Sequence, residues 1–266
     1  MTSFWSRIVV ALVGLPVVLG LVWLGGWWLV GLVAVAAVLA LHEFWQMTRS
    51  LRPLALAGYA GAALALLGAQ LGGQVWMLAG FMATLLFALL LNGISETRAP
   101  ATVAIGVTVL GSAWIGLGLS FAVLMRDLPD NARLATFTVL LCVFAADTVA
   151  YFGGRVFGRH KLAPALSPGK TWEGFVLGTA AAVLVAFFAL YQDRNTYLSI
   201  AEALALGAVV ALAAAAGDLF ESALKRDMQV KDTGRLLGGH GGMLDRIDSL
   251  LFAIPAGYYL ILAFTT

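Results

Sequence analysis

Nine apolar runs, each long enough to cross a membrane, constrain this chain more than any other feature of its sequence. They occupy residues 8–24, 27–44, 54–71, 75–91, 101–125, 134–152, 172–191, 200–216 and 249–264. In lipid, backbone N–H and C=O groups must form their hydrogen bonds within the protein, which restricts membrane spans to helices and closed barrels. The runs are too long for strands and show no period-two alternation, so we predict helices. The chain is 61% hydrophobic and 11% charged, more apolar than a soluble domain of this length could bury. The predicted fold class is all-α, a polytopic membrane protein with about nine transmembrane helices.

The distribution of Lys and Arg predicts the orientation, because cytoplasmic segments carry an excess of both. With a cytoplasmic N-terminus, 13 of the 16 basic residues fall in inner segments, and only Arg126, Arg133 and Arg194 fall outside. The two long polar loops, 153–171 and 217–248, are then both cytoplasmic. We divide the single integral membrane unit into N-terminal helices, 1–133, and a catalytic region, 134–266. The net charge of +2 is too small to indicate nucleic-acid binding.

The first loop combines basic residues with glycines, a composition that suits an anion. Asp147 lies in an apolar run, where a carboxylate is costly and usually faces a polar cavity or a partner, and Tyr151 follows one turn later. Glycines between the cations let a backbone approach phosphate closely. The loop's basic residues are Arg155, Arg159, Lys161 and Lys170. The alternative interpretation is a basic loop that serves only topology or lipid headgroups.

The first loop ends in the sequence Ser167-Pro168-Gly169-Lys170-Thr171, which leads directly into the next apolar run. Ser167 or Thr171 is expected to cap that helix, whose N-terminus attracts phosphate. The sequence is similar to the end of a P-loop, but the glycine spacing is wrong and no strand precedes it. We therefore exclude a Walker motif.

The second loop places carboxylates and cations beside a glycine-rich turn. Asp218, Glu221, Ser222 and Lys225 are spaced to share one face of a helix that continues from the preceding run. Asp245 and Asp248, one turn apart, start the last helix and suit a hard cation such as magnesium. The alternative is that they complement the helix dipole.

The residues from 238 to 242 are too rich in glycine for a stable helix and predict a turn that comes close to another group. His240 lies within this turn, and it has no second His or Cys at ligand spacing, so we do not expect zinc there. We expect His240 to donate to a phosphate oxygen or to position the turn.

At these residues the chain resembles the phosphatidate cytidylyltransferase family, the CDP-diacylglycerol synthases. The long spaced signature is matched by Ser222, Lys225-Arg226, Lys231-Asp232, Gly234, Gly238, His240-Gly241-Gly242 and Asp245-Arg246-Ile247-Asp248. The first loop resembles the family in Asp147, Tyr151, Gly154-Arg155, Gly158-Arg159 and 167–171. The second half of the chain matches closely, and the first four spans match only in kind.

The resemblance implies that CTP and phosphatidic acid give CDP-diacylglycerol and pyrophosphate, with magnesium. It also implies a second, monovalent cation, a homodimer, and a bacterial inner membrane with the active site on the cytoplasmic side. We assign metal binding to Asp218, Asp245 and Asp248, and catalysis to these three with Lys225, Arg226 and His240. We assign substrate binding to Asp147, Tyr151, Arg155, Arg159, Ser167, Lys170, Thr171, Ser222, Lys231, Gly241, Gly242 and Arg246.

Two other functions are open to a chain of this kind. A CTP-dependent lipid kinase would use the same nucleotide and a membrane lipid but would release CDP instead of pyrophosphate. A transporter usually places polar residues near the membrane midplane, and the middle thirds of the nine predicted spans carry no Lys, Arg, Asp or Glu. Transport is therefore the less favoured alternative.

Overall fold

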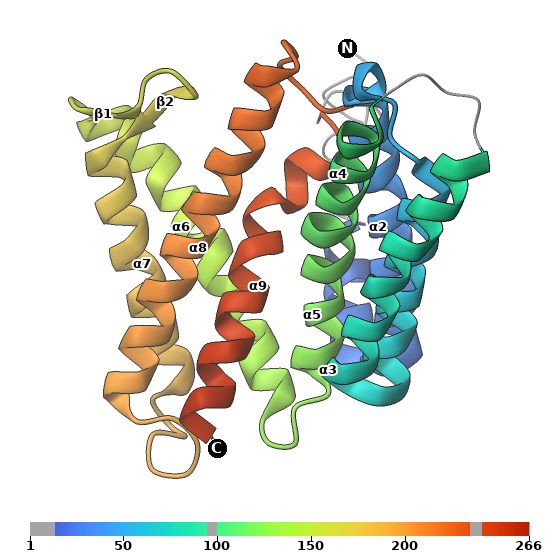
Figure 1. Ribbon diagram of the computed structural model, residues 1–266. Coiled ribbons are helices and arrows are strands. Elements are labelled where there is room, and N and C mark those ends of the chain that lie inside the picture. Colours follow the sequence, from blue (N-terminus) through green and yellow to red (C-terminus); the bar gives the residue numbers. More distant parts are fainter. Residues whose placement is uncertain (1–13, 95–99, 235–240, 266) are drawn as a thin grey trace. The chain divides into compact units, whose positions relative to one another are not determined.

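The computed structural model describes residues 14–94, 100–234 and 241–265. The chain forms two compact units, Met1–Leu124 with Met228–Arg246, and Met125–Asp227 with Ile247–Thr266. Figure 1 shows the elements in chain order. The described residues 228–234 and 241–246, which we assigned to the catalytic region from the sequence, therefore belong to the same unit as the N-terminal helices.

The first unit is built from the helix Gly14–Leu24, α2 (Gly26–Met47), the short 3₁₀ turn η1 (Arg49–Leu51), α3 (Ala55–Ile94) and α4 (Ala101–Gly111). A π-helical turn, η2 (Ser112–Leu117), continues α4 into α5 (Gly118–Arg126). The core is aromatic around α2, where the Phe44 ring meets Trp45 and Trp114 edge to face. Glu43, the residue before Phe44, is 1% exposed.

Helix α3 is two helical arms joined at a sharp bend. Gly72 and Gly73 leave the helical conformation, and Gly73 takes a φ of 67°, which glycine adopts without strain. The arms then pack face to face, because Gly61 meets Thr84 and Gly80 meets Leu64 with no room for a Cβ. The two runs predicted at 54–71 and 75–91 correspond to these two arms.

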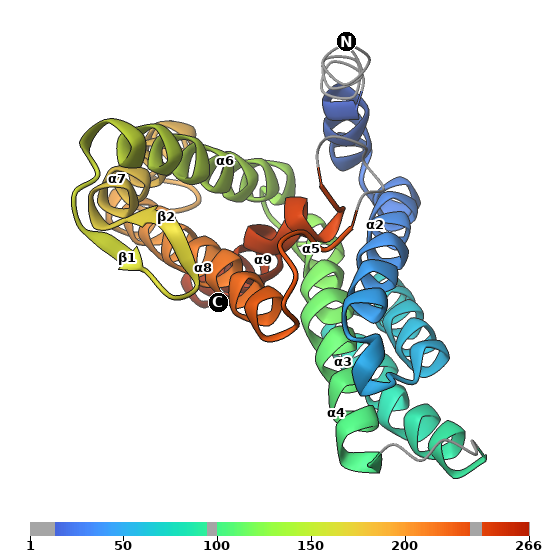
Figure 2. The same ribbon diagram turned by 90° about the horizontal axis from the view of Figure 1, so that it is seen from above.

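The second unit is built from α6 (Ala132–Phe157), α7 (Trp172–Leu190), α8 (Ile200–Asp227) and most of α9 (Leu244–Thr265). Between α6 and α7 lies a two-stranded antiparallel hairpin, β1 (Lys161–Ala163) and β2 (Ser167–Thr171), that the sequence analysis did not predict. Figures 1 and 2 show the hairpin beside the end of α6 and the start of α7.

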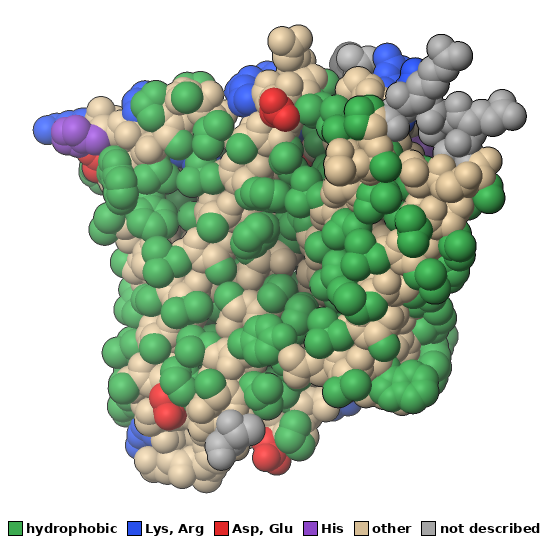
Figure 3. All heavy atoms as spheres, in the orientation of Figure 1, with side chains coloured by type: hydrophobic (Ala, Val, Ile, Leu, Met, Phe, Trp, Pro, Cys, Tyr) green, Lys and Arg blue, Asp and Glu red, His purple; other side chains and the backbone are tan. Residues whose placement is uncertain are grey.

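The helices have the length and composition of membrane spans. Seven helices of the described part can cross a membrane, and one of these is the bent α3. Figure 3 shows hydrophobic side chains over the middle stretches of the helices and charged side chains near their ends. These features confirm an all-α integral membrane protein, while the count of nine spans and the side of the N-terminus stay predictions.

Candidate active site

Three carboxylates come together in the second unit, one from each of three helices. Asp147 lies on α6, Asp218 on α8 and Asp248 on α9, and each interacts electrostatically with the other two. Asp248 is 8% exposed and accepts a hydrogen bond of 2.7 Å from the Ser249 amide. The Ser249 side chain hydrogen bonds to Asp147. Ionised carboxylates at this range repel one another, so a cation would stabilise the cluster.

The hairpin supplies one cation to this cluster. Lys170, in β2, places its Nζ 2.7 Å from Oδ2 of Asp218, and the two side chains are 23% and 35% exposed. The Ser222 hydroxyl lies one turn along α8, 3.5 Å from Oδ1 of Asp218. The structure thus brings together the predicted site residues Asp147, Lys170, Asp218 and Ser222 with Asp248.

The basic residues at the end of α8 already have partners. Lys225 lies 2.5 Å from Oε2 of Glu221, whose side chain is 1% exposed and also hydrogen bonds to Asp248. Arg226 donates through Nε to the Leu166 carbonyl at 3.1 Å, which joins α8 to the hairpin. Helix α8 runs to Asp227, which confirms the prediction that Asp218 to Lys225 lie on one continuing helix.

The start of α7 is capped as predicted, since Oγ1 of Thr171 accepts a hydrogen bond of 3.1 Å from the Gly174 amide. Glu173 accepts hydrogen bonds from the Arg159 and His160 amides at 3.1–3.2 Å, and its Oε1 lies 2.6 Å from Nδ1 of His160. This junction, which the sequence analysis did not assign, closes the base of the hairpin.

The remaining residues predicted in the first loop stay near the surface. Arg155 reaches the Tyr151 hydroxyl at 3.4 Å, and both side chains are exposed, as is Arg159. Ser167 pairs with Ala163 in the strand register. The Tyr151, Arg155 and Arg159 side chains are accessible to a ligand, whereas Asp248 of the carboxylate cluster is buried.

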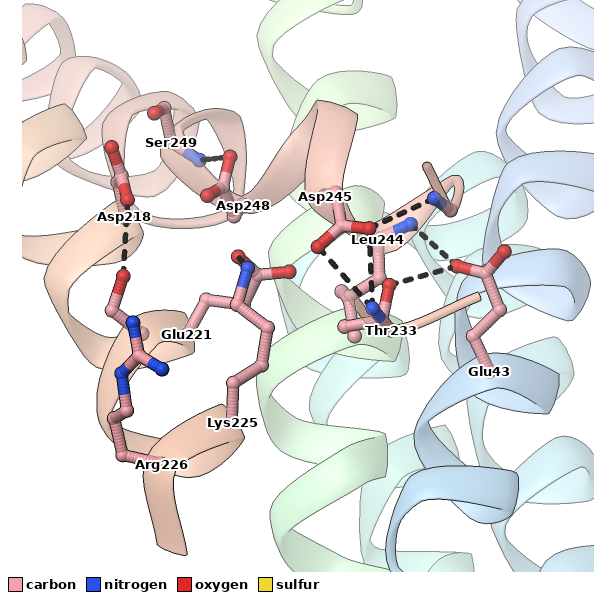
Figure 4. Close-up of polar contacts among 12 residues, drawn as sticks. Glu43, Asp218, Glu221, Lys225, Arg226, Thr233, Leu244, Asp245, Asp248 and Ser249 are labelled. Carbon is pink, nitrogen blue, oxygen red and sulfur yellow. Dashed lines mark hydrogen bonds and ion pairs between the residues drawn. The ribbon is translucent and has the colours of Figure 1, made fainter. Parts of the chain in front are cut away.

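In the first unit, two further carboxylates hold the polypeptide on either side of the undescribed stretch 235–240. Asp245 accepts from the Gly242 amide at 2.8 Å and from the Thr233 amide at 3.2 Å. Glu43 accepts from the Met243 amide through Oε1 and from the Leu244 amide through Oε2, each at 2.9 Å. Figure 4 shows the Asp245 carboxylate facing Thr233 and the Glu43 carboxylate facing Thr233 and Leu244. Asp245 and Asp248, which we expected on one side of the helix, therefore have different partners.

The rest of the glycine turn is described in part. Gly241 has a φ of +80°, and Gly242 packs so closely against Glu43 and Thr233 that a Cβ would overlap them, which agrees with the expected turn. Lys231 is exposed, and the Arg246 amide donates to the Met243 carbonyl at 3.0 Å. The predicted contacts of His240 lie outside the described residues.

The donor chemistry of the Asp147, Asp218 and Asp248 cluster fits a magnesium ion, which prefers oxygen ligands. In residues 14–94, 100–234 and 241–265, no group of three or more His, Cys, Asp or Glu side chains is arranged to hold a metal. Magnesium usually takes one or two carboxylates together with waters and substrate phosphates, so a dedicated cage is not required. Asp218 and Asp248 are the carboxylates of this cluster that match the predicted metal ligands.

Fold and site together define a polytopic α-helical membrane protein in which three helices bring carboxylates together beside a basic side chain of the hairpin. The chain belongs to the cytidylyltransferase family, whose model matches residues 5–264.

Three relatives illustrate the family, and each is called phosphatidate cytidylyltransferase. The Mycobacterium bovis protein is 34% identical over 96% of this chain and 87% of its own length. The Synechocystis protein is 33% identical over 96% of both chains. The Haemophilus influenzae protein is 46% identical over 48% of this chain and 45% of its own length.

Proposed function

We propose that this protein is a phosphatidate cytidylyltransferase, which transfers a cytidylyl group from CTP to phosphatidate and forms CDP-diacylglycerol and pyrophosphate. The observation that carries the proposal is the family match over residues 5–264, with relatives of this name aligned along 96% of the chain. The membrane fold suits a lipid substrate, and the charged residues near the helix ends suit a polyanionic nucleotide.

The reaction needs positioning and charge neutralisation more than it needs a strong base. A phosphate monoester has a second pKa of about 6, so the phosphatidate phosphate is largely dianionic near neutral pH. One of its oxygens attacks the α-phosphorus of CTP, and the bond from that phosphorus to the oxygen bridging to the β-phosphate breaks. Pyrophosphate leaves with the electron pair. In this proposal Lys170, Arg155 and Arg159 neutralise phosphate charge, which the exposure of the two arginines supports.

Magnesium, when bound, would neutralise charge on the triphosphate and orient it for in-line attack. Asp218 and Asp248 would hold the ion, and Asp147 lies close enough to interact with both through its charge. We still predict that Asp245 is a third metal ligand. In this structure its carboxylate accepts hydrogen bonds from the Gly242 and Thr233 amides. A monovalent cation remains an expectation from the family resemblance.

The proposed setting is a bacterial inner membrane with the active site on the cytoplasmic side, because CTP is a cytoplasmic substrate and the basic residues concentrate in the predicted inner loops. The family resemblance supports a homodimer. The partners are CTP, phosphatidate and the bilayer, and the small net charge gives no support to nucleic acid.

The decisive experiment identifies the products made by purified protein from CTP, phosphatidate and magnesium. We expect CDP-diacylglycerol and pyrophosphate in equal amounts. Release of CDP would establish a lipid kinase, and solute flux in proteoliposomes without CTP would support transport. Asp218→Asn should abolish product formation, whereas Asp193→Asn, in the loop between α7 and α8, should retain it as a matched control.

A further inference from the structure

Glu43 is a buried carboxylate that belongs to no predicted set of site residues. Its side chain rises from α2 and is 1% exposed, although an ionisable group in an apolar helix is costly unless it is paired. The Glu43 carboxylate accepts hydrogen bonds from backbone amides near the C-terminal end of the chain. Both amides that bond to it, those of Met243 and Leu244, lie at 2.9 Å.

Glu43 bonds to two separate parts of the chain, one before and one after residues 235–240. The Met243 and Leu244 amides belong to the start of α9, where unpaired N–H groups and the helix dipole favour a negative charge. The Thr233 hydroxyl donates to Oε2 of Glu43 at 3.3 Å, on the other side of the undescribed stretch 235–240. One carboxylate therefore bonds to the chain on both sides of that stretch, as Figure 4 shows for the labelled residues.

The glycines of the segment fit this arrangement. A Cβ at Gly234 or at Gly242 would lie within van der Waals overlap of the Glu43 carboxyl group. The absence of side chains at these two positions lets the backbone approach the carboxylate closely enough for the amide hydrogen bonds. Thr233 is also shared, because its amide donates to Asp245 while its hydroxyl donates to Glu43.

We propose that Glu43 is a positioning residue for cytidylyl transfer. It fixes residues 233–234 and, at the start of α9, residues 241–244, and through them the carboxylate of Asp245. This inference rests on the proposed function. The contacts of Glu43 are features of the structure and do not depend on that function. Glu43 itself touches no substrate in this proposal and acts through the residues whose backbone it binds.

The test is Glu43→Gln, which keeps the size of the side chain but replaces one accepting oxygen with an amide that cannot accept. The matched control is Glu202→Gln at the start of α8, where Oε2 of Glu202 accepts from the Ser199 amide at 2.7 Å. Thr233→Val is nearly isosteric and removes only the hydroxyl that donates to Glu43. It replaces Glu43→Gln as the test variant if that protein does not fold.

Two readouts separate a positioning role from a general loss of structure. Hydrogen–deuterium exchange should accelerate at least tenfold for the Met243 and Leu244 amides in Glu43→Gln, with exchange in α6 and α7 unchanged. In monodisperse protein, kcat should fall at least tenfold while KM for CTP changes less than threefold. Thr233→Val should show a smaller fall in kcat, and Glu202→Gln none.

Each outcome decides the proposal. Unchanged exchange at 243–244 in Glu43→Gln would show that the carboxylate does not hold the segment. Faster exchange with wild-type kcat would overturn the positioning role, and so would a loss of activity that follows only a loss of folded protein. A wild-type protein that makes no CDP-diacylglycerol would instead refute the proposed function, and the exchange measurement would still test whether Glu43 holds the segment.

Discussion

Replacing Lys170 with methionine is expected to tighten magnesium binding to the substrate-free protein while slowing turnover. The ammonium group of Lys170 lies 2.7 Å from Oδ2 of Asp218, one of the two proposed magnesium ligands in the carboxylate cluster. A magnesium ion at Asp218 would therefore compete with Lys170 for the same oxygen. Methionine keeps most of the length and removes the charge.

The magnitude follows from the exposure of the pair. With side chains 23% and 35% exposed, solvent screens the interaction, and an ion pair of this kind contributes about 1 kcal/mol. Releasing Asp218 should then lower the magnesium dissociation constant about fivefold, and the lost repulsion between the two cations acts in the same direction. A lost contact to substrate phosphate of about 1.5–3 kcal/mol should lower kcat/KM by roughly 10- to 150-fold.

The assay is thermal unfolding of purified protein at fixed ionic strength, titrated with magnesium in the absence of CTP. Lys161→Met is the control, because it removes one positive charge from the same hairpin. Magnesium should raise the unfolding temperature of Lys170→Met at lower concentrations than it does for wild type and the control. An unchanged or weaker magnesium affinity in Lys170→Met would refute the competition between the two cations.

Three further predictions follow from the site and the topology. Asp245→Asn is expected to abolish magnesium-dependent CDP-diacylglycerol formation by monodisperse protein, and substantial activity with an unchanged magnesium dependence would remove Asp245 from the metal site. Lys225→Ala should lower kcat/KM for CTP by roughly 10- to 150-fold, the effect of losing a contact to charged phosphate; near wild-type kinetics would limit Lys225 to its ion pair with Glu221. Single cysteines at Leu162 and Val230 should resist an impermeant thiol reagent in intact cells and react after permeabilisation, and labelling from outside would contradict the predicted orientation.

Hydropathy predicted the helices because lipid leaves the backbone few alternatives. Even the two arms of α3 followed from the apolar runs, since Gly72 and Gly73 interrupt them. The hairpin at 161–171 was missed because its strands are short, polar and rich in turn residues, so that only their mutual pairing defines them.

The partners of the carboxylates could be predicted only in part. Spacing placed Asp245 and Asp248 one turn apart on a helix, which was correct, but their partners depend on tertiary packing. Asp245 meets the Thr233 and Gly242 amides, and Asp248 meets the Glu221 side chain. Glu43 lies in the apolar run 27–44, as Asp147 lies in another, but its partners could not be predicted because they lie 200 and 201 residues away in the chain.

That separation of 200 residues has a consequence for how the protein is made. Synthesis runs from the N-terminus, so α2 enters the membrane long before the Met243 and Leu244 amides exist. Until α9 is inserted, water or lipid headgroups must solvate the Glu43 carboxylate, because an unpaired charge in hydrocarbon is costly. The hydrogen bonds of Glu43 to Met243 and Leu244 consequently form only after the start of the last helix has been synthesised. A nascent chain released before α9 would carry most of the membrane helices, but its Glu43 carboxylate would lack the Met243 and Leu244 amides as hydrogen-bond donors.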